Sequence, residues 1–327
     1  MERGRLDEPT ELNALTSEGA RVLSNPTLSP PIWSPRSPRW LLQCLGACDG
    51  YVMVQGGAYR VNKVADDSFG VSVTPEGDRS NLSSATFGVS HSHSELQAVQ
   101  ASYARYESTP REIRLEPIQS VVKISTRVPQ LYSNNHDQLK LQLALTAEFI
   151  YETKENLCFN HPEYGLLNNV HSDMKVRASG PPTPDVLDDL LARVWKRPDM
   201  FVLHPQALAE FRKQATANSI TLDEVRMFGS SFSCFRCVPL VPSNKLGLSS
   251  GAGGSQVTDV LLMRLGLEKQ GVICLCQDGL KASPMLPYIT VEEMRTDDNS
   301  VANYLLTTYC AMAVLSPGAL ASAEVSV

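Results

Sequence analysis

The stretch NHDQLKLQLALTAEFIYETKENLCFN, residues 135–160, decides the fold because it carries the longest helical signal in the chain. Asn135 can cap a helix, and Asp137 lies in the first turn, where the helix dipole favours a negative charge. Apolar side chains then recur along one stripe: Leu139, Leu143, Ala147, Ile150 and Leu157. About 25 helical residues make a rod roughly 37 Å long. We therefore predict that this helix is the spine of a domain.

The sequence before this helix alternates polar and apolar residues over positions 51–128, which predicts strands with one covered face. Between these strands, Asp66–Gln97 is rich in Ser, Gly and Asp and indicates a long two-stranded loop. Such a hairpin is only marginally stable alone, so a neighbouring chain is expected to support it. Residues 1–39 hold six prolines and fit either a disordered tail or an arm that orders against a neighbour. The expected arm anchors are Trp33, Trp40 and Leu41.

The sequence after the spine helix predicts two further helices. Thr183 caps the first, Pro184 takes its first helical position, and Pro198 is expected to stop it, with Lys196 and Arg197 at its negative end. The second is expected to begin at His204-Pro205. Strands are predicted at 232–241, 259–265, 271–277 and 288–294, and the apolar run 301–315 is expected to be buried core.

The composition of the chain argues against several classes of function. The chain has 327 residues, a net charge of −6 and no long Lys/Arg cluster, which argues against a nucleic-acid partner. Residues 1–20 lack the apolar stretch of a secretory signal, and polar residues interrupt 301–315, so no membrane partner is expected. Eight cysteines without a secretory signal indicate reduced thiols in a cytosol. A cytoplasmic protein is therefore expected.

Two cysteine pairs have spacings that metals use. Cys234-x-x-Cys237 and Cys274-x-Cys276 together would supply four thiolates for zinc. Both pairs lie in strand-like runs, where positions 234 and 237 would point to opposite faces, so ordinary core cysteines are the favoured interpretation. Five cysteines sit inside apolar stretches: Cys44, Cys158, Cys274, Cys276 and Cys310.

Other motifs give weak chemical signals. His91-x-His93 could bind a metal from one strand face, but its Ser-rich surroundings favour solvated loop. Cys158 and His161 could form a nucleophile pair, but no third orienting group is evident. Residues 251–254 are glycine-rich yet lack the context of a phosphate-binding loop. We therefore predict no catalytic residue, metal site or cofactor site, and a zinc or thiol enzyme is kept as an alternative.

Taken together, ordered sequence blocks from about residue 38 to residue 315 resemble family 2 encapsulins, which are bacterial nanocompartment shell proteins. The blocks are PRWLL (38–42), YRVN (59–62), YESTPRE (106–112), LYSNNHDQ (131–138), PEYGLL (162–167), PTPD (182–185), VWKRP (194–198), MFG (227–229), VPLVPS (238–243) and Tyr304-Leu305. The Asp66–Gln97 region, which includes His91-Ser92-His93, departs from the family pattern.

The resemblance implies the α+β, HK-97-like fold of tailed-phage major capsid proteins. Its parts would be an N-terminal arm (1–48), an extended loop (49–112), a peripheral domain with the spine helix (113–178), an axial domain (179–285) and a return to the peripheral domain (286–327). The chain lacks room for the cyclic-nucleotide-binding insert of one family branch. It is therefore similar to the branch without that insert.

The same resemblance implies a structural subunit and no enzymatic activity. About sixty copies would close an icosahedral shell. The enclosed cargo enzyme would be a cysteine desulfurase of sulfur metabolism, and its pyridoxal phosphate would belong to the cargo. The alternatives are a phage-type major capsid protein that packages nucleic acid and a membrane-associated antigen.

The resemblance also places the loop Ala215–Asp223 around a fivefold pore. The residues expected to line it are Ala217, Asn218, Ser219, Ile220 and Thr221. Their side chains are small and mostly neutral, so the pore is expected to pass small polar metabolites such as cysteine. An ordinary surface loop is an equally open interpretation.

Overall fold

The structure of the chain is a computed structural model. It describes residues 37–62, 110–125, 138–178, 180–194, 196–250, 254, 256–278, 282–283, 286–294 and 301–327. The chain divides into two compact units, one made of Met1–Gly57 with Leu115–Val327 and the other of Ala58–Arg114. Within the described ranges, no helix is long and apolar enough to cross a membrane.

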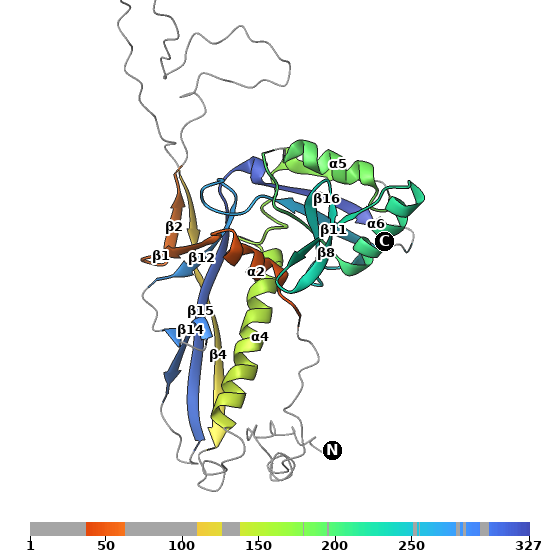
Figure 1. The fold of residues 1–327 in the computed structure, drawn as a ribbon. Helices are drawn as coiled ribbons and strands as arrows, with labels where there is room; N and C mark the ends of the chain where they lie inside the picture. Colours follow the sequence, from red (N-terminus) through yellow and green to blue (C-terminus); the bar gives the residue numbers. More distant parts are fainter. Residues whose placement is uncertain are drawn as a thin grey trace, which may run out of the picture. The chain divides into compact units, whose positions relative to one another are not determined.

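The spine helix is α4, Gln138–Asn160, which confirms the predicted helix; the expected cap and first turn, 135–137, lie outside the described residues. Its inner face packs on a sheet through Ala147 and Ile150, which meet Val122, Ile124 and Leu306. Figure 1 shows α4 running alongside β4 and β15. The apolar stripe therefore packs against one face of a sheet, as its helical spacing predicts.

That sheet has six strands in the described part of the chain, in the order β1-β12-β15-β14-β13, with β4 also paired to β15. The strands are β1 (Tyr51–Val54), β4 (Glu116–Ser125), β12 (Val272–Gln277), β13 (Ala282–Ser283), β14 (Leu286–Glu293) and β15 (Val301–Val314). β15 is the long central strand. One of its edges pairs with β4, and the other pairs first with β14 and then with β12.

A second sheet has eight described strands, in the order β5-β16-β11-β6-β9-β8-β7, with β10 paired to β11. The strands are β5 (Lys175–Arg177), β6 (Met200–Leu203), β7 (Asp223–Met227), β8 (Ser230–Phe235), β9 (Val238–Pro242), β10 (Ser249–Ser250), β11 (Gln256–Met263) and β16 (Leu320–Ser326). Helices α5 (Pro184–Arg193) and α6 (Pro205–Ala217) cover it, with Leu187, Leu190 and Phe211 fully buried. Short 3-10 turns are η3 (Ser172–Met174) and η4 (Pro317–Ala319).

Both helix starts are as predicted. Thr183 accepts a hydrogen bond from the backbone N–H of Val186, and His204 accepts one from that of Gln206. The predicted end of α5 is wrong, because the helix ends at Arg193 with Val194 as its C-cap. Val194 is fully buried, and the chain leaves the helix there to lead into β6. Lys196 and Arg197 therefore lie in the following turn, where Arg197 has a positive φ of 56°.

Two other sequence predictions need correction. The run 232–241 was expected to be continuous strand, but it is the β8–β9 hairpin, whose turn residues Arg236 and Cys237 have φ of 51° and 66°. The chain's end also differs from the expected return of 286–327 to one domain. β14 and β15 join the six-stranded sheet, but β16 pairs with β11 and β5 of the other sheet, because its small apolar side chains fill that core.

The N-terminal described segment is a short helix, α2 (Trp40–Ala47), which buries Leu41, Cys44 and Leu45. It leads into β1, which pairs in parallel with β12. In the second unit, β2 (Ala58–Val61) and β3 (Arg111–Arg114) form an antiparallel pair. The loop Asp66–Gln97, with His91 and His93, lies outside the described residues.

Candidate functional site

The residues just before α2 form an N-terminal clasp, Ser37–Leu41, centred on Glu152 of α4. The Ser37 backbone N–H and hydroxyl donate to the Glu152 carboxylate at 2.7 and 2.8 Å. Lys245, which follows β9, pairs with the same carboxylate, and Arg39 lies 3.6 Å from it. Burial favours the neutral acid, but the hydrogen bonds from Lys245 and Ser37 outweigh it and lower the pKa of Glu152. Glu152 therefore ties three segments together.

The clasp continues one turn further along α4. The backbone N–H of Leu41 donates to Oε1 of Glu155 at 3.0 Å, so this buried carboxylate caps the first turn of α2. On the other side, the Trp40 ring stacks on Phe228 at 6.3 Å and meets Phe232 edge-on at 5.0 Å. Phe232 lies in β8. The clasp thus connects the spine helix to the β7–β8 hairpin within one chain.

Two of the three expected arm anchors, Trp40 and Leu41, take part in these contacts. Leu41 is 1% exposed, and Trp40 packs on aromatic rings of its own chain. Trp33 lies outside the described residues. The clasp therefore fixes the position of residues 37–41, and the interlocking of residues 1–36 with a neighbouring subunit stays a prediction.

A second cluster lies next to the clasp, around Lys154. The Lys154 side chain is 2% exposed, its Nζ is 3.6 Å from Sγ of Cys276, and it lies over the rings of Tyr51 and Tyr288 at 5.3 and 5.6 Å. The thiols around it belong to α4, β12 and β15. They are Cys158, Cys274, Cys276 and Cys310, all nearly or fully buried.

The electrostatics of this cluster follow from its thiol contacts. Burial alone would lower the pKa of Lys154, but the nearby thiols and Tyr51 keep that pKa above its ordinary value. Hydrogen bonds from Cys158 and Cys276, together with the Lys154 charge, lower the pKa of Cys274. The same hydrogen bonds raise the pKa of Cys158 and of Cys276. Lys154 and Cys274 therefore each favour the charged form of the other.

The four-thiolate zinc hypothesis does not fit the geometry. Cys234 lies in the eight-stranded sheet and Cys274 in the six-stranded sheet, while Cys237 is an exposed turn residue. The expectation that Cys237 belongs to a strand is wrong, because the hairpin turn includes it. Among the described residues, no group of three His, Cys, Asp or Glu side chains is placed to hold a metal ion.

The Cys158–His161 pair is not arranged as a nucleophile and base. Nε2 of His161 lies 3.0 Å from the Glu116 carboxylate, and Nδ1 accepts hydrogen bonds from the backbone N–H groups of Glu163 and Tyr164. Both ring nitrogens are thus engaged elsewhere, and the ring stacks on Tyr164 at 3.7 Å. Cys158 instead shares hydrogen bonds with Cys274 and Cys310.

The proposed pore loop joins α6 to β7. Asn218 caps the C-terminus of α6, and its Nδ2 donates to the carbonyl of Gln214 at 3.0 Å. Ser219 follows with a φ of 57°. Ala217, Asn218, Ser219 and Thr221 are exposed, whereas Ile220 is half-buried and packs against the core of the eight-stranded sheet. Four of the five expected pore residues therefore present their side chains to solvent in the single chain.

Sequence reasoning missed the charged residues of the clasp and of the thiol cluster. Glu152, Lys154 and Glu155 are buried, although Glu and Lys rarely are. One signal could have found Lys154. It lies four residues after Ile150 and four before Cys158, so the helical period places it on the inner stripe.

Solved structures first define the class of protein. The capsid of a native GTA particle matches with a TM-score of 0.58 at 12% identity, covering 97% of this chain and all of that one. The capsid of Ralstonia phage GP4 matches with a TM-score of 0.59 at 9% identity, covering 93% of this chain and 94% of that one. At such identities the likeness shows the fold alone. The chain has the HK-97-like capsid fold, as the resemblance implied.

Closer relatives define the family. The family model for the type 2A encapsulin shell protein, SrpI-like, matches residues 74–327. The type 2A encapsulin shell protein SrpI of Synechococcus elongatus is 39% identical over 309 residues, 94% of this chain and 92% of the relative. The corresponding shell protein of Mycolicibacterium paratuberculosis is 38% identical over 95% of this chain and 94% of its own.

A cryo-EM structure of the holo-SrpI encapsulin complex from Synechococcus elongatus matches with a TM-score of 0.75 at 37% identity, over 95% of this chain and 96% of that one. The chain therefore belongs to the SrpI-like family of type 2A encapsulin shell proteins. It is a structural shell subunit that forms a nanocompartment and not an enzyme, as the relatives' names describe.

Proposed function

We propose that this chain closes an icosahedral shell of about sixty copies around a cargo enzyme in the cytoplasm. One observation carries the proposal: the chain matches a subunit of an assembled encapsulin complex over 95% of its own length and 96% of the other at 37% identity. A match over nearly both full lengths leaves no large insertion to change how subunits meet. The GTA capsid of the same fold was determined with fivefold symmetry.

The surface of the single chain supports subunit contacts. Phe149 on α4 is 55% exposed, and Val121 on β4 is 49% exposed. Burial of large apolar side chains at such positions against a neighbouring copy lowers the free energy of the assembly. Each contact can be modest, because every subunit in a closed shell makes several at once.

Assembly is tested on the purified protein by negative-stain microscopy and mass photometry. We expect uniform closed particles of about sixty subunits. Phe149→Asp should reduce particle yield, because it places a charge in a contact. Lys213→Asp, an exposed charge change on α6, serves as the matched control. A compact monomer at high protein concentration would contradict the proposal.

We propose a cysteine desulfurase of sulfur metabolism as the cargo, with pyridoxal phosphate bound to the cargo and not to this chain. The support is the sequence resemblance to the encapsulin branch without the cyclic-nucleotide-binding insert. Co-expression with a cysteine desulfurase should bring pyridoxal phosphate into the particle fraction, whereas an unrelated pyridoxal-phosphate enzyme should remain outside. Equal recovery of both enzymes would sink the cargo assignment.

The alternative, a capsid that packages nucleic acid, predicts a different particle. Its fraction would carry ultraviolet absorbance that nuclease removes after the particles are opened. The net charge of −6 favours the enzyme-containing shell, because packaged nucleic acid needs compensating positive charge.

We further propose that Ala217, Asn218, Ser219, Ile220 and Thr221 line the fivefold pore. The four exposed side chains of this loop are uncharged, which fits passage of small polar molecules such as cysteine with little charge selection. Ile220, which packs inward, would support the loop from behind.

A further inference from the structure

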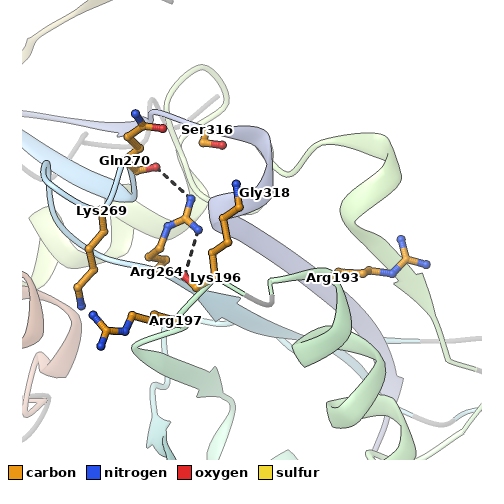
Figure 2. Close-up of a pocket in the computed structure, with 8 residues that line it drawn as sticks. All are labelled: Arg193, Lys196, Arg197, Arg264, Lys269, Gln270, Ser316 and Gly318. Atoms are coloured by element: carbon orange, nitrogen blue, oxygen red, sulfur yellow. Dashed lines mark hydrogen bonds between the residues drawn. The ribbon is translucent and has the colours of Figure 1, made fainter. Parts of the chain in front are cut away.

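A pocket of about 370 Å³ lies where the turn after α5, the β11–β12 loop and η4 meet. Its lining residues, shown in Figure 2, are Arg193, Lys196, Arg197, Arg264, Lys269, Gln270, Ser316 and Gly318. Five of the eight are cationic and none is acidic, in a chain whose net charge is −6. We call this the arginine pocket. None of its lining residues belongs to the clasp, the thiol cluster or the proposed pore loop.

Arg264 is the buried member of the arginine pocket. It is 5% exposed, and its backbone is fixed on two sides, with its N–H donating to Ala319 and its carbonyl accepting from Val272. Gly271 passes so close that a Cβ there would lie 2.4 Å from the Arg264 carbonyl oxygen. The position of this arginine is therefore set by the turn that presents it.

The guanidinium of Arg264 lacks a full set of partners. It donates to the backbone carbonyls of Lys196 at 3.2 Å and Gln270 at 3.5 Å, drawn as dashed lines in Figure 2. Its Nε finds no acceptor among the described residues. Burial lowers the pKa of Arg264, although the charge of Asp199 opposes this. A buried guanidinium with an unused donor is costly unless an anion meets it.

The nearby carboxylate does not neutralise the pocket. Asp199 accepts the backbone N–H of Leu265 at 2.7 Å and pairs with Lys269, so it compensates one lysine. Arg197 makes no ion pair within the described part of the chain, and its φ of 56° fixes it in a left-handed turn. Arg193 points away from the other cations in Figure 2 and donates to the Asp173 carbonyl. Positive charge thus remains in excess around Arg264.

We propose that the arginine pocket binds a phosphate-class oxyanion, a free or substituted phosphate or sulfate group, over the guanidinium of Arg264. Such a group offers several acceptor oxygens, which suits the forked donors of arginine. Arg197 supplies further charge among the lining residues, and the Ser316 hydroxyl is an additional donor. The volume exceeds that of an inorganic ion, so a small phosphorylated metabolite fits the same chemistry.

The test measures binding of radiolabelled inorganic phosphate to assembled wild-type shells by equilibrium dialysis at low ionic strength. We expect saturable binding of about one phosphate per subunit, with sulfate competing and chloride not competing at equal ionic strength. Arg197→Gln should weaken the affinity about tenfold, as loss of one charge-assisted hydrogen bond predicts. Arg177→Gln, an exposed arginine of β5 outside the pocket, should leave it unchanged.

Cryo-EM of wild-type shells in phosphate and in chloride buffer gives a second readout that does not depend on any variant folding. Density beside Arg264 that appears only with phosphate supports the site. Absence of saturable binding, equal affinity in the two variants, or a neighbouring subunit's chain filling the pocket would overturn it. All lining residues belong to one chain, so loss of phosphate binding and loss of shell closure are separate outcomes. Particle counts measure shell closure independently of binding.

Discussion

Nζ of Lys154 lies 3.6 Å from Sγ of Cys276, and both side chains are buried between α4 and the six-stranded sheet. Burial opposes the charge of Lys154, but the nearby thiols Cys274, Cys276 and Cys310 raise its pKa, and the Lys154 charge helps to lower the pKa of Cys274. A thiolate differs from a carboxylate because it becomes a neutral, apolar thiol when its partner is removed. Removal of the Lys154 ammonium therefore need not leave a buried ion, because the thiols around it are neutral when protonated.

The first prediction follows from this property. Lys154→Met keeps the volume, and the thiols simply remain protonated, so the free energy of unfolding should stay within about 1.5 kcal/mol of wild type. Lys154→Ala should lose about 2–4 kcal/mol, because it leaves a cavity. Urea unfolding at one fixed protein concentration measures both. If Lys154→Met lost as much as Lys154→Ala, the ammonium itself would be stabilising the fold.

The second prediction concerns Glu155, whose pKa burial raises to about 7 from its ordinary 4.5, against the hydrogen bond from Leu41. An acid whose pKa is higher in the folded state contributes stability at low pH, which is lost as pH rises from about 4.5 through 7. The loss is on the order of 3 kcal/mol. Glu155→Gln keeps an oxygen for the Leu41 N–H and should therefore be more stable than wild type at pH 8.

This advantage of Glu155→Gln should shrink as the pH falls towards 5, since the wild-type carboxyl is then protonated when folded. Thermal melts across this pH range measure it. Glu163→Gln, at an exposed position just after α4, is the matched control and should show no such trend. A constant difference at every pH would mean that Glu155 does not titrate in this window.

How far the sequence predicts this fold differs between elements. The stripe Leu139–Ile150 is enough to predict α4, because only a helix brings those residues to one side. Thr183-Pro184 is enough to predict where α5 begins, since capping is local chemistry. The predicted end of α5 is wrong. Pro198 marks only the last place where a helix could stop, whereas α5 ends earlier, at Arg193, where Val194 is buried in the core.

The clasp and the arginine pocket were beyond sequence reasoning for a different reason. Each brings together residues far apart in the chain, such as Ser37 with Glu152, or Lys196 with Arg264. Residue types alone indicate solvated charges at these positions, because Glu, Lys and Arg are mostly exposed. Only the fold shows that Glu152 and Arg264 are buried.

The third prediction separates the clasp from the segment before it. Trp40→Ala removes the ring contacts to Phe228 and Phe232 and should lower the free energy of unfolding by about 2 kcal/mol, whereas Trp40→Phe should keep much of it. Deleting residues 1–36 removes none of the clasp residues, and if this segment interlocks subunits, the particles should dissociate at lower temperature. Particles of normal heat resistance after this deletion would show that the segment does not interlock subunits.

The fourth prediction tests the pore loop at Asn218, which is exposed at the end of α6. If Asn218 faces a fivefold axis, Asn218→His brings five imidazoles around one point, and such a ring should bind Ni²⁺ or Zn²⁺ at about one ion per five subunits. Lys213→His, five residues earlier at an exposed position of α6, gives an equally accessible imidazole without symmetry partners. Elemental analysis of extensively dialysed particles reads the ratio directly.

The Asn218 side chain contributes little to the stability of the subunit, so its replacement tests only where this residue lies in the shell. Replacing it removes one hydrogen bond to the Gln214 carbonyl, at a cost of about 1 kcal/mol, which leaves the folded subunit intact. Metal retained by Asn218→His and not by Lys213→His can therefore come only from neighbouring copies. Equal retention by both variants, or by neither, places Asn218 away from the axis, and the loop would then be ordinary surface.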